Sequence, residues 1–402
     1  MNMKQITNYG NSVLQIKIGN YLPKSETFIY NHIINLKNYR PIVVTQEVSN
    51  LGIFPYEPIE LLPFIEKINP KFIWQVLKLK KKYNPVLIHA HFGSSGVYGL
   101  LLKKILNVPL ITSFHGVDIS AALKDPFWQA AYQKLFKQGD FFTGTSDYMR
   151  NQIRNAGCPQ DKIRVVHVGI DLDQFKFSPR EIDNSKDVHF LTVGRLVEKK
   201  GMDDTIKAFA IVNESFPSTK LHIIGEGPLR KELEKLAADL KLKDKITFRG
   251  ETSYMEVIEQ MQTADVFVLA SKTAKNGDQE GTTMVTKEAL ASGMPVVATS
   301  HAGIPEVICD NINGFLVSEG DYQALAMKMI SILNNKIPLQ IMAETGRKHI
   351  EKNFNIKMVS KEYEKLYEEA ITLSPKVQSS KSLLEKMLQY FIDRTTQREC
   401  NN

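Results

Sequence analysis

Short apolar runs that alternate with helical stretches constrain the fold of this chain more than any other feature. The second half of the sequence repeats one pattern, in which an apolar run is followed by a stretch with helical periodicity. The predicted strands cover residues 188–194, 219–225, 245–249, 265–271 and 295–299. Strands that alternate with helices indicate a parallel sheet covered by helices on both faces. The sequence therefore predicts an α/β domain with a doubly wound sheet.

The first half of the chain carries the same alternation. Its predicted strands cover residues 12–18, 41–45, 86–90, 109–113, 140–145 and 163–168. A polar segment at 169–187 separates the two halves, and 402 residues are more than one typical core holds. We therefore expect two Rossmann-like domains facing each other across a cleft, over residues 1–178 and 179–356. A helix at about 357–372 and a polar tail at 373–402 follow, and the tail includes one segment that could form an amphipathic helix.

The composition fits a soluble protein of a reducing compartment. Apolar residues make up 43% and charged residues 24% of the chain, which is ordinary for a globular protein. Cys158, Cys309 and Cys400 show no CxxC spacing, so neither a disulfide framework nor a zinc site is expected. No run approaches 18 consecutive apolar residues, so we expect no transmembrane helix and no cleaved signal peptide. These features predict a cytoplasmic location.

Positive charge is concentrated in the first half of the chain. Residues 1–178 contain 21 Lys and Arg against 12 Asp and Glu, a net charge of +9, which leaves −2 for the remainder. An anionic partner of the first domain is therefore expected, either membrane phospholipid or nucleic acid. The basic residues are not interleaved with aromatic residues, which disfavours nucleic acid. The lysine-rich helix at 71–82 could bind an anionic membrane surface or could simply be a solvated helix.

The stretch at residues 280–306 predicts a binding site for a diphosphate and a sugar. A Gly-Thr-Thr turn should start a helix near residues 282–285, where unpaired backbone amides can hold an anion. Glu288 lies about one turn further along, roughly 6 to 8 Å at 1.5 Å per residue, and could accept hydrogen bonds from ribose hydroxyls. Glu280 precedes the helix and could bind hydroxyl groups beyond the diphosphate. This order matches a nucleotide-sugar.

Two cations and one histidine are predicted to join this site. Arg195 and Lys200 follow the first strand of the second domain, where they could reach the diphosphate and stabilise a departing anion. His115 follows the strand at 109–113 and can face the cleft, although a lone histidine is more often structural.

Gly225 and Gly227 in the sequence GEGP resemble a phosphate-binding glycine loop. A lone GxG is weak evidence, because it can also serve only to let two chain segments pass closely.

Two motifs could suggest a metal ion, and neither is persuasive. His89 and His91 would share one face of a strand, but no carboxylate or cysteine cluster accompanies them in the sequence. Asp171 and Asp173 form a D-x-D motif, yet it lies in the interdomain segment, where aspartates commonly cap turns. No metal site is predicted.

Taken in order along both domains, several motifs resemble those of the retaining family 4 glycosyltransferases, which have the GT-B architecture. The matching stretches are SETF at 25–28, FHGVD at 114–118, HVGIDLDQF at 167–175, VGRLVEKKG at 193–201, IIGEGP at 223–228 and the segment from 280 to 306. The opening YLPKSETFI is most similar to the bacterial exopolysaccharide and lipopolysaccharide branch, which includes colanic-acid-type enzymes. One departure is that Gly281 is followed by Thr-Thr-Met, without the proline common in the family.

The resemblance implies transfer of a hexose from a UDP- or GDP-sugar to a glycan or lipid-linked saccharide, with retention and without metal or cofactor. Glu280 would hold the donor sugar, His115 would contact it from the opposite wall, and Glu288 would bind the ribose. The diphosphate would be bound by Arg195, Lys200 and the backbone of Gly281, Thr282, Thr283 and Met284. The acceptor would face Ser25, Glu26 and Thr27.

Two alternatives share the same architecture. A nucleotide-sugar epimerase would convert the donor without an acceptor, and a non-catalytic protein would only bind the nucleotide-sugar.

Overall fold

The computed structural model describes residues 11–23, 26–63, 69–334 and 338–374. The first domain is built on a seven-stranded sheet in the order β5-β3-β1-β6-β7-β8-β9, in which every pairing is parallel. The strands are β1 Asn11–Ile16, β3 Tyr39–Thr45, β5 Ile59–Leu61, β6 Pro85–His91, β7 Leu110–Ser113, β8 Phe141–Gly144 and β9 Ile163–Val165. The helices are α1 Thr27–Asn35, α2 Pro70–Tyr83, α3 Gly93–Leu106, α4 Pro126–Gln138 and α5 Asp147–Asn155. Two further strands, β2 Asn20–Tyr21 and β4 Glu47–Val48, pair beside this sheet.

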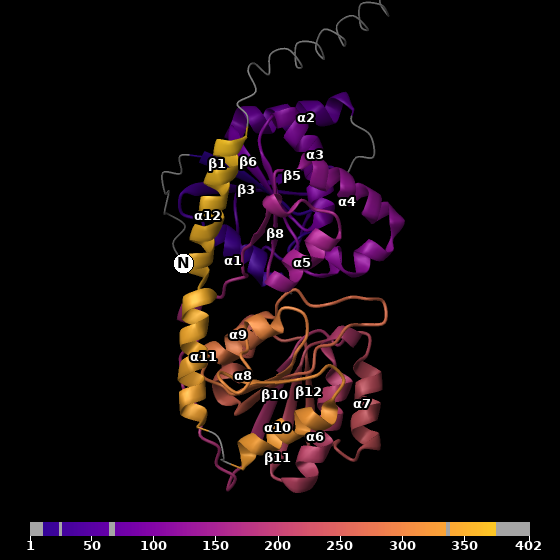
Figure 1. Ribbon diagram of the computed structural model, residues 1–402, viewed down its shortest axis with the longest axis vertical. Coiled ribbons are helices and arrows are strands. Elements are labelled where there is room, and N and C mark those ends of the chain that lie inside the picture. Colours follow the sequence, from indigo (N-terminus) through magenta and orange to yellow (C-terminus); the bar gives the residue numbers. More distant parts are fainter. Residues whose placement is uncertain (1–10, 24–25, 64–68, 335–337, 375–402) are drawn as a thin grey trace, which may run out of the picture.

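The second domain is built on a six-stranded parallel sheet in the order β12-β11-β10-β13-β14-β15. Its strands are β10 Val188–Val193, β11 Thr219–Ile224, β12 Ile246–Gly250, β13 Val266–Leu269, β14 Val296–Thr299 and β15 Phe315–Val317. Its helices are α6 Met202–Ser215, α7 Arg230–Asp239, α8 Tyr254–Thr263, α9 Met284–Ala291, α10 Tyr322–Leu333 and α11 Leu339–Asn353. The strand order reverses between β10 and β13, the position at which such sheets bind ligands beyond the carboxyl ends of their strands. The expected α/β class with two doubly wound domains is confirmed (Figure 1).

The final helix α12, Ile356–Leu373, returns to the first domain. Figure 1 shows α11 and α12 following one another along one side of the molecule, α11 beside the second domain and α12 beside the first. The Tyr367 hydroxyl of α12 contacts His89 Nδ1 at 2.7 Å and His32 Nε2 at 2.9 Å, and Gln15 Nε2 donates to it at 3.1 Å. Each of these side chains is buried, so the hydroxyl satisfies polar groups that have no access to water. This network joins α12 to β1, α1 and β6.

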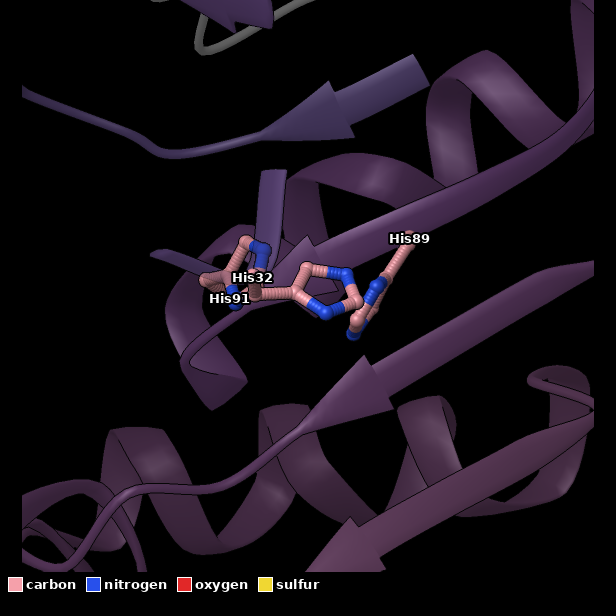
Figure 2. Close-up of side chains that lie close together, drawn as sticks. All are labelled: His32, His89 and His91. Atoms are coloured by element: carbon pink, nitrogen blue, oxygen red, sulfur yellow. The ribbon is translucent and has the colours of Figure 1, made fainter. Parts of the chain in front are cut away.

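Three buried histidines lie close together (Figure 2), and two of them, His32 and His89, contact Tyr367 of this helix. The ligand nitrogens of His32, His89 and His91 lie within 4.8 Å of one another. The sequence pairs only His89 with His91, and the fold adds His32 from α1 because that helix packs against the same sheet. His89 already uses both ring nitrogens, since Nε2 contacts the Ser113 hydroxyl at 2.7 Å. The absence of a metal site stays a prediction.

Two short strands and the C-terminal tail differ from the predicted elements or lie beyond the described residues. The short edge strands β5 and β15 are not among the strands that the sequence pattern predicts, whereas the equally short β9 falls within the longer apolar run at 163–168. Within the part of the chain that the structure describes, no helix is long and apolar enough to cross a membrane. The possible amphipathic helix of the 373–402 tail, at residues 382–392, lies outside the described residues.

Candidate functional site

The amino end of helix α9 forms the centre of the candidate site. Thr283 is the N-cap residue, but its side chain makes no capping hydrogen bond, so the first amides of the helix are not occupied by their own cap. The preceding turn lies against the first domain. A Cβ atom at Gly281 would come within 2.7 Å of the His115 carbonyl oxygen, which explains why a glycine is required there. The free helix end therefore faces the junction of the two domains.

Glu280 and Lys200 form an ion pair beside this helix end. Lys200 Nζ lies 2.8 Å from Glu280 Oε1, and the exposed fractions of the two side chains are only 13% and 9%. Burial by itself would raise the pKa of Glu280, but the charges of Lys200 and Lys199 outweigh it and hold that pKa below its usual range. Lys199 is in turn paired with Asp278 at 3.0 Å. Glu280 is therefore an ionised carboxylate at neutral pH.

A buried histidine, which sequence reasoning missed, holds the backbone of Glu280. His301 Nε2 accepts a hydrogen bond from the Glu280 amide at 3.2 Å, and its Nδ1 lies 2.7 Å from Glu319 Oε1. The carboxylate fixes the tautomer, because Nδ1 must carry the proton for Nε2 to accept. The sequence offers one signal for this role, since His301 comes two residues after the end of strand β14, at the same sheet edge as Glu280.

Glu288 lies one turn into α9 and is almost completely buried. The Tyr254 hydroxyl donates to its Oε1 at 3.0 Å. Burial raises the pKa of Glu288 to about 7, although the hydrogen bond from Tyr254 acts in the opposite direction. The two glutamates of the motif therefore differ, because Glu280 has a cation beside it and Glu288 has only a hydroxyl donor and the more distant charge of Lys287.

The turn after β10 brings Arg195 to the same edge of the sheet. Its side chain is exposed, and its positive charge acts to lower the pKa of Glu26 in the first domain, so Arg195 lies on the side that faces the cleft.

Gly225 and Gly227 pack against the turn that carries Arg195 and do not form an open phosphate-binding loop. A Cβ atom at Gly225 would lie 1.9 Å from the Gly194 carbonyl oxygen, and one at Gly227 would lie 2.5 Å from that of Leu196. The two glycines therefore permit close chain passage and support the Arg195 turn.

His115 lies on the opposite wall, at the carboxyl end of β7. The carboxylate of Asp118, in the short helix Val117–Ile119, accepts hydrogen bonds from the amides of His115 and Gly116, each at 3.0 Å, and shapes this turn. Burial lowers the pKa of His115 to about 3, so its ring is neutral. Neither ring nitrogen has a hydrogen-bond partner among the described residues. The ring borders a cavity of about 20 Å³, together with Phe28, His91 and Tyr363.

The segment predicted to face an acceptor lies near this wall. Ser25 falls outside the described residues. Glu26 is the N-cap residue of α1, and Lys17 Nζ lies 3.5 Å from its carboxylate. Burial raises the pKa of Glu26, although Lys17 opposes the shift. Thr27 is the first residue of α1. One partly buried carboxylate of the first domain therefore lies within electrostatic reach of Arg195.

Two contacts join the walls of the cleft directly. Glu306, in the short helix Ile304–Glu306 of the second domain, accepts hydrogen bonds from the α5 amides of Asp147 at 2.9 Å and Tyr148 at 3.1 Å. The Tyr148 hydroxyl donates to Gln279 Oε1 at 2.8 Å. Glu306 therefore caps a helix of the other domain, and Gln279 connects that helix to the turn that carries Glu280.

The predicted site residues thus meet at one junction. Glu280, Lys200 and the start of α9 lie together, Arg195 is on the neighbouring turn, and Glu288 follows within the helix. His115 approaches this group from the first domain. Such an arrangement offers an ion-paired carboxylate, free helix amides and two cations around one cleft.

Two family models match the chain, and together they cover most of it. Residues 37–174 match "Glycosyltransferase Family 4", and residues 173–349 match "Glycosyl transferases group 1". A protein of Escherichia coli strain K12 named as the colanic acid biosynthesis glycosyltransferase WcaL is 31% identical over 318 residues, which is 73% of this chain and 78% of that protein. The chain belongs to the family 4 glycosyltransferases. It is therefore a transferase enzyme, as the sequence motifs predict.

A second relative and the solved structures agree with this assignment. The amylovoran biosynthesis glycosyltransferase AmsK of Erwinia amylovora is 33% identical over 278 residues, 69% of this chain and 68% of that protein. The structure of HepE from Anabaena in complex with UDP has a TM-score of 0.77 at 19% identity, covering 89% of this chain and all of that one. A glycosyltransferase from Rickettsia africae has a TM-score of 0.73 at 21% identity, over 91% and 100% of the two chains. These structural likenesses confirm the GT-B fold.

Proposed function

We propose that this glycosyltransferase moves a hexose from a UDP- or GDP-linked sugar to a glycan or lipid-linked saccharide, with retention of anomeric configuration, in cell-surface polysaccharide synthesis. The observation that carries the proposal is the Lys200–Glu280 ion pair at the free amino end of α9. Relatives named for colanic acid and amylovoran biosynthesis support the polysaccharide, and HepE structures named with UDP and with UDP-glucose support the donor class.

In this proposal the helix end and the cations bind the donor diphosphate. The backbone from Gly281 to Met284 offers amides to the phosphate oxygens, while Arg195 and Lys200 neutralise the charge that develops as the sugar leaves. These interactions are stronger in the transition state than with bound donor, because the leaving diphosphate carries more negative charge there. No metal ion is needed for this step, so activity should survive treatment with EDTA.

Glu288, Glu280 and His115 bind the ribose and the sugar of the donor. The Glu288 carboxylate accepts hydrogen bonds from the ribose hydroxyls, and Glu280 accepts them from the sugar. His115 is neutral, so it can hydrogen-bond a sugar hydroxyl from the opposite wall without adding charge. Retention follows if the acceptor attacks from the face that the diphosphate leaves, with the leaving phosphate taking the acceptor's proton. Glu26 and Thr27 border the acceptor in this scheme, and Ser25 is assigned there by the resemblance alone.

A panel of labelled UDP- and GDP-sugars tests the proposal. Wild-type protein should bind one donor and hydrolyse it slowly without acceptor, and Glu280→Gln should abolish the hydrolysis. Glu234→Gln removes an exposed carboxylate on α7 and serves as the control, because among the described residues its ion pair is with Arg230 of the same helix. If no donor binds, the proposal is wrong. Proton NMR of the product's anomeric signal then checks retention.

We further propose that the enzyme works at the inner face of the cytoplasmic membrane and binds it through α2. The exposed residues Lys71, Trp74, Lys78 and Lys81 recur at helical spacing along one side of this helix. Trp74 is 63% exposed, and Lys78 Nζ lies 5.5 Å from its ring centroid. A tryptophan among lysines suits the boundary between anionic headgroups and acyl chains.

Sedimentation with vesicles tests this second part. Vesicles containing phosphatidylserine should retain the protein in a salt-sensitive way, and Trp74→Ala should weaken retention without changing donor binding. Phe127→Ala is the matched control, because it removes an aromatic side chain of similar exposure, 66%, from α4. Equal retention by neutral vesicles would contradict the proposal.

A further inference from the structure

Lys287 is a completely buried lysine on α9 for which the donor-site roles above provide no function. Its side chain leads away from Glu288 toward the segment that connects the two domains. Lys287 Nζ donates to the Val168 carbonyl oxygen at 2.8 Å and to the Thr282 hydroxyl oxygen at 3.1 Å. The amine therefore joins the interdomain segment to the turn that begins the donor site.

The second crossing of the chain between the domains lies at the same place. The Phe354 ring lies 4.7 Å from Lys287 Nζ, just before α12 begins. The Ile170 amide donates to the Phe354 carbonyl oxygen at 2.8 Å, so the two crossing segments are hydrogen-bonded to each other. Lys287 thus contacts both segments that connect the domains, as well as Thr282.

A lysine in this position lacks the partner that a buried charge normally has. Among the described residues, no carboxylate lies within ion-pair distance of Lys287 Nζ. By contrast, Lys200, Lys199 and Lys272 of the same domain each form an ion pair with a carboxylate. Burying an ammonium group without a counter-ion is costly. Two neutral oxygen acceptors leave one of its three N–H donors unassigned. An anion bound at the start of α9 would supply the missing charge.

We propose that Lys287 is a positioning residue for the donor diphosphate, acting through Thr282 from the hinge between the domains. The inference rests on the proposed donor site. By donating to the Thr282 oxygen, Lys287 turns the Thr282 hydroxyl proton outward, where a phosphate oxygen can accept it. The positive charge of Lys287 adds to the partial positive charge at the amino end of α9, and both attract a bound diphosphate. The diphosphate therefore has a third positive group behind Arg195 and Lys200.

In this arrangement, binding of the donor diphosphate is coupled to uptake of a proton by the Lys287 amine. Burial lowers the pKa of Lys287 to about 7, and the charges of Glu288 and Glu306 act against that shift. His167 on the connecting segment and His349 on α11 also lie near the Phe354 ring, with ring centroids 4.9 Å and 5.6 Å from it. At pH 8 roughly nine-tenths of a group with this pKa is neutral. A bound diphosphate raises the pKa and draws a proton onto the amine, whereas Glu288 is already mostly ionised at pH 8.

Calorimetry with UDP and GDP at pH 8, in two buffers of different ionisation enthalpy, measures that proton. Wild-type protein should take up between about half and one proton on binding. Lys287→Met should take up none and bind about tenfold more weakly. Lys162→Met is the matched control. Lys162 Nζ, like Lys287 Nζ, donates to neutral oxygens, here backbone carbonyls that include Gly139 O at 2.8 Å, but it lies in the first domain, away from α9. It should keep both the affinity and the proton uptake.

The outcomes separate the two proposals. If wild-type protein binds neither nucleotide, the proposed donor site is wrong. If it binds one of them and Lys287→Met shows the same affinity and proton uptake, only the inference about Lys287 is overturned. Should Lys287→Met fail to fold, Thr282→Val decides. That variant keeps the lysine and removes the connecting hydroxyl, so it should bind more weakly while the hinge contact to Val168 remains, and unchanged affinity would overturn the inference.

Discussion

Lys200 Nζ lies 2.8 Å from Glu280 Oε1, so the turn after β10 and the turn before α9 are joined by an ion pair at the sheet's reversal point. Lys200 is the last residue of the short 3-10 helix Glu198–Lys200, and Glu280 lies in the irregular segment before α9. The pair fixes the cation and the carboxylate relative to each other before any donor arrives. Preorganised charges of this kind cost no reorganisation during the reaction.

Removing the cation should therefore harm both stability and turnover. Lys200→Met leaves Glu280 buried and unpaired, which should cost roughly 2 to 3 kcal/mol of unfolding free energy, somewhat less than for a completely buried pair. Turnover should fall at least about a hundredfold. The double variant Lys200→Met/Glu280→Gln should regain part of the stability but none of the activity. Urea denaturation and donor hydrolysis measure the two effects, and a double variant no more stable than Lys200→Met would contradict the pairing.

Glu288 should give nucleotide binding a pH dependence on the acid side of neutrality. Its folded-state pKa is about 7, so protonation below that pH removes a carboxylate that can accept two hydroxyl hydrogen bonds. Affinity for UDP or GDP should weaken up to about tenfold per pH unit between pH 6 and 5. Lys287, with a pKa of about 7, is half protonated at pH 7 but about nine-tenths protonated at pH 6, so it adds little slope in this lower window. The Glu288→Gln variant should bind weakly and without the slope, and the same slope in that variant would assign it to another group.

The same shift affects stability with a definite sign. Glu288 binds its proton more tightly in the folded than in the unfolded protein, where its pKa is near 4.3. The folded state therefore holds more protons between about pH 4.5 and 7, and unfolding free energy should fall as pH rises through this window. Glu288→Gln should lose that contribution, which thermal unfolding at pH 5 and pH 7 can measure.

Glu306 should control how the domains close. Its carboxylate caps α5 of the first domain, so Glu306→Ala removes two charge-assisted hydrogen bonds across the cleft and should cost about 1 to 2 kcal/mol of interdomain contact. Small-angle scattering of the donor-free variant should show a larger radius of gyration. Asp321→Ala is the control, because Asp321 caps α10 within its own domain. An increase of similar size in both variants would mean that the change is not specific to the cleft.

Tyr367 should contribute to stability more than a single hydroxyl usually does. Tyr367→Phe leaves the polar groups of His89, His32 and Gln15 buried without their shared partner, which should cost about 2 to 3 kcal/mol. Tyr39→Phe is the comparison, since the buried Tyr39 ring packs edge-on against Tyr367. That change should cost less than about 0.5 kcal/mol. Equal losses would show that the hydroxyl network does not hold α12 in place.

The sequence by itself determines the class of the fold and the residue types at the proposed donor site. Short apolar runs that alternate with helical stretches indicate parallel sheets. A strand that is apolar on both faces must be covered by helices on both sides of its sheet. Glu280 and Glu288 flank a helix start at a spacing that is local in the chain, so their separation needs no tertiary information. For the same reason, Arg195 and Lys200 could be assigned to one edge of the second sheet.

Tertiary structure alone decides which of these groups meet and in what state. The pairing of Glu280 with Lys200 joins residues 80 positions apart in the chain and leaves Glu288 without an ion-paired cation of its own. His301 acts on Glu280 because the two turns fold together, and Lys287 becomes buried because both interdomain crossings pass over it. Ionisation depends on burial and on neighbours from other elements. That information is non-local, which is why the sequence pattern identifies the carboxylates but not their charge.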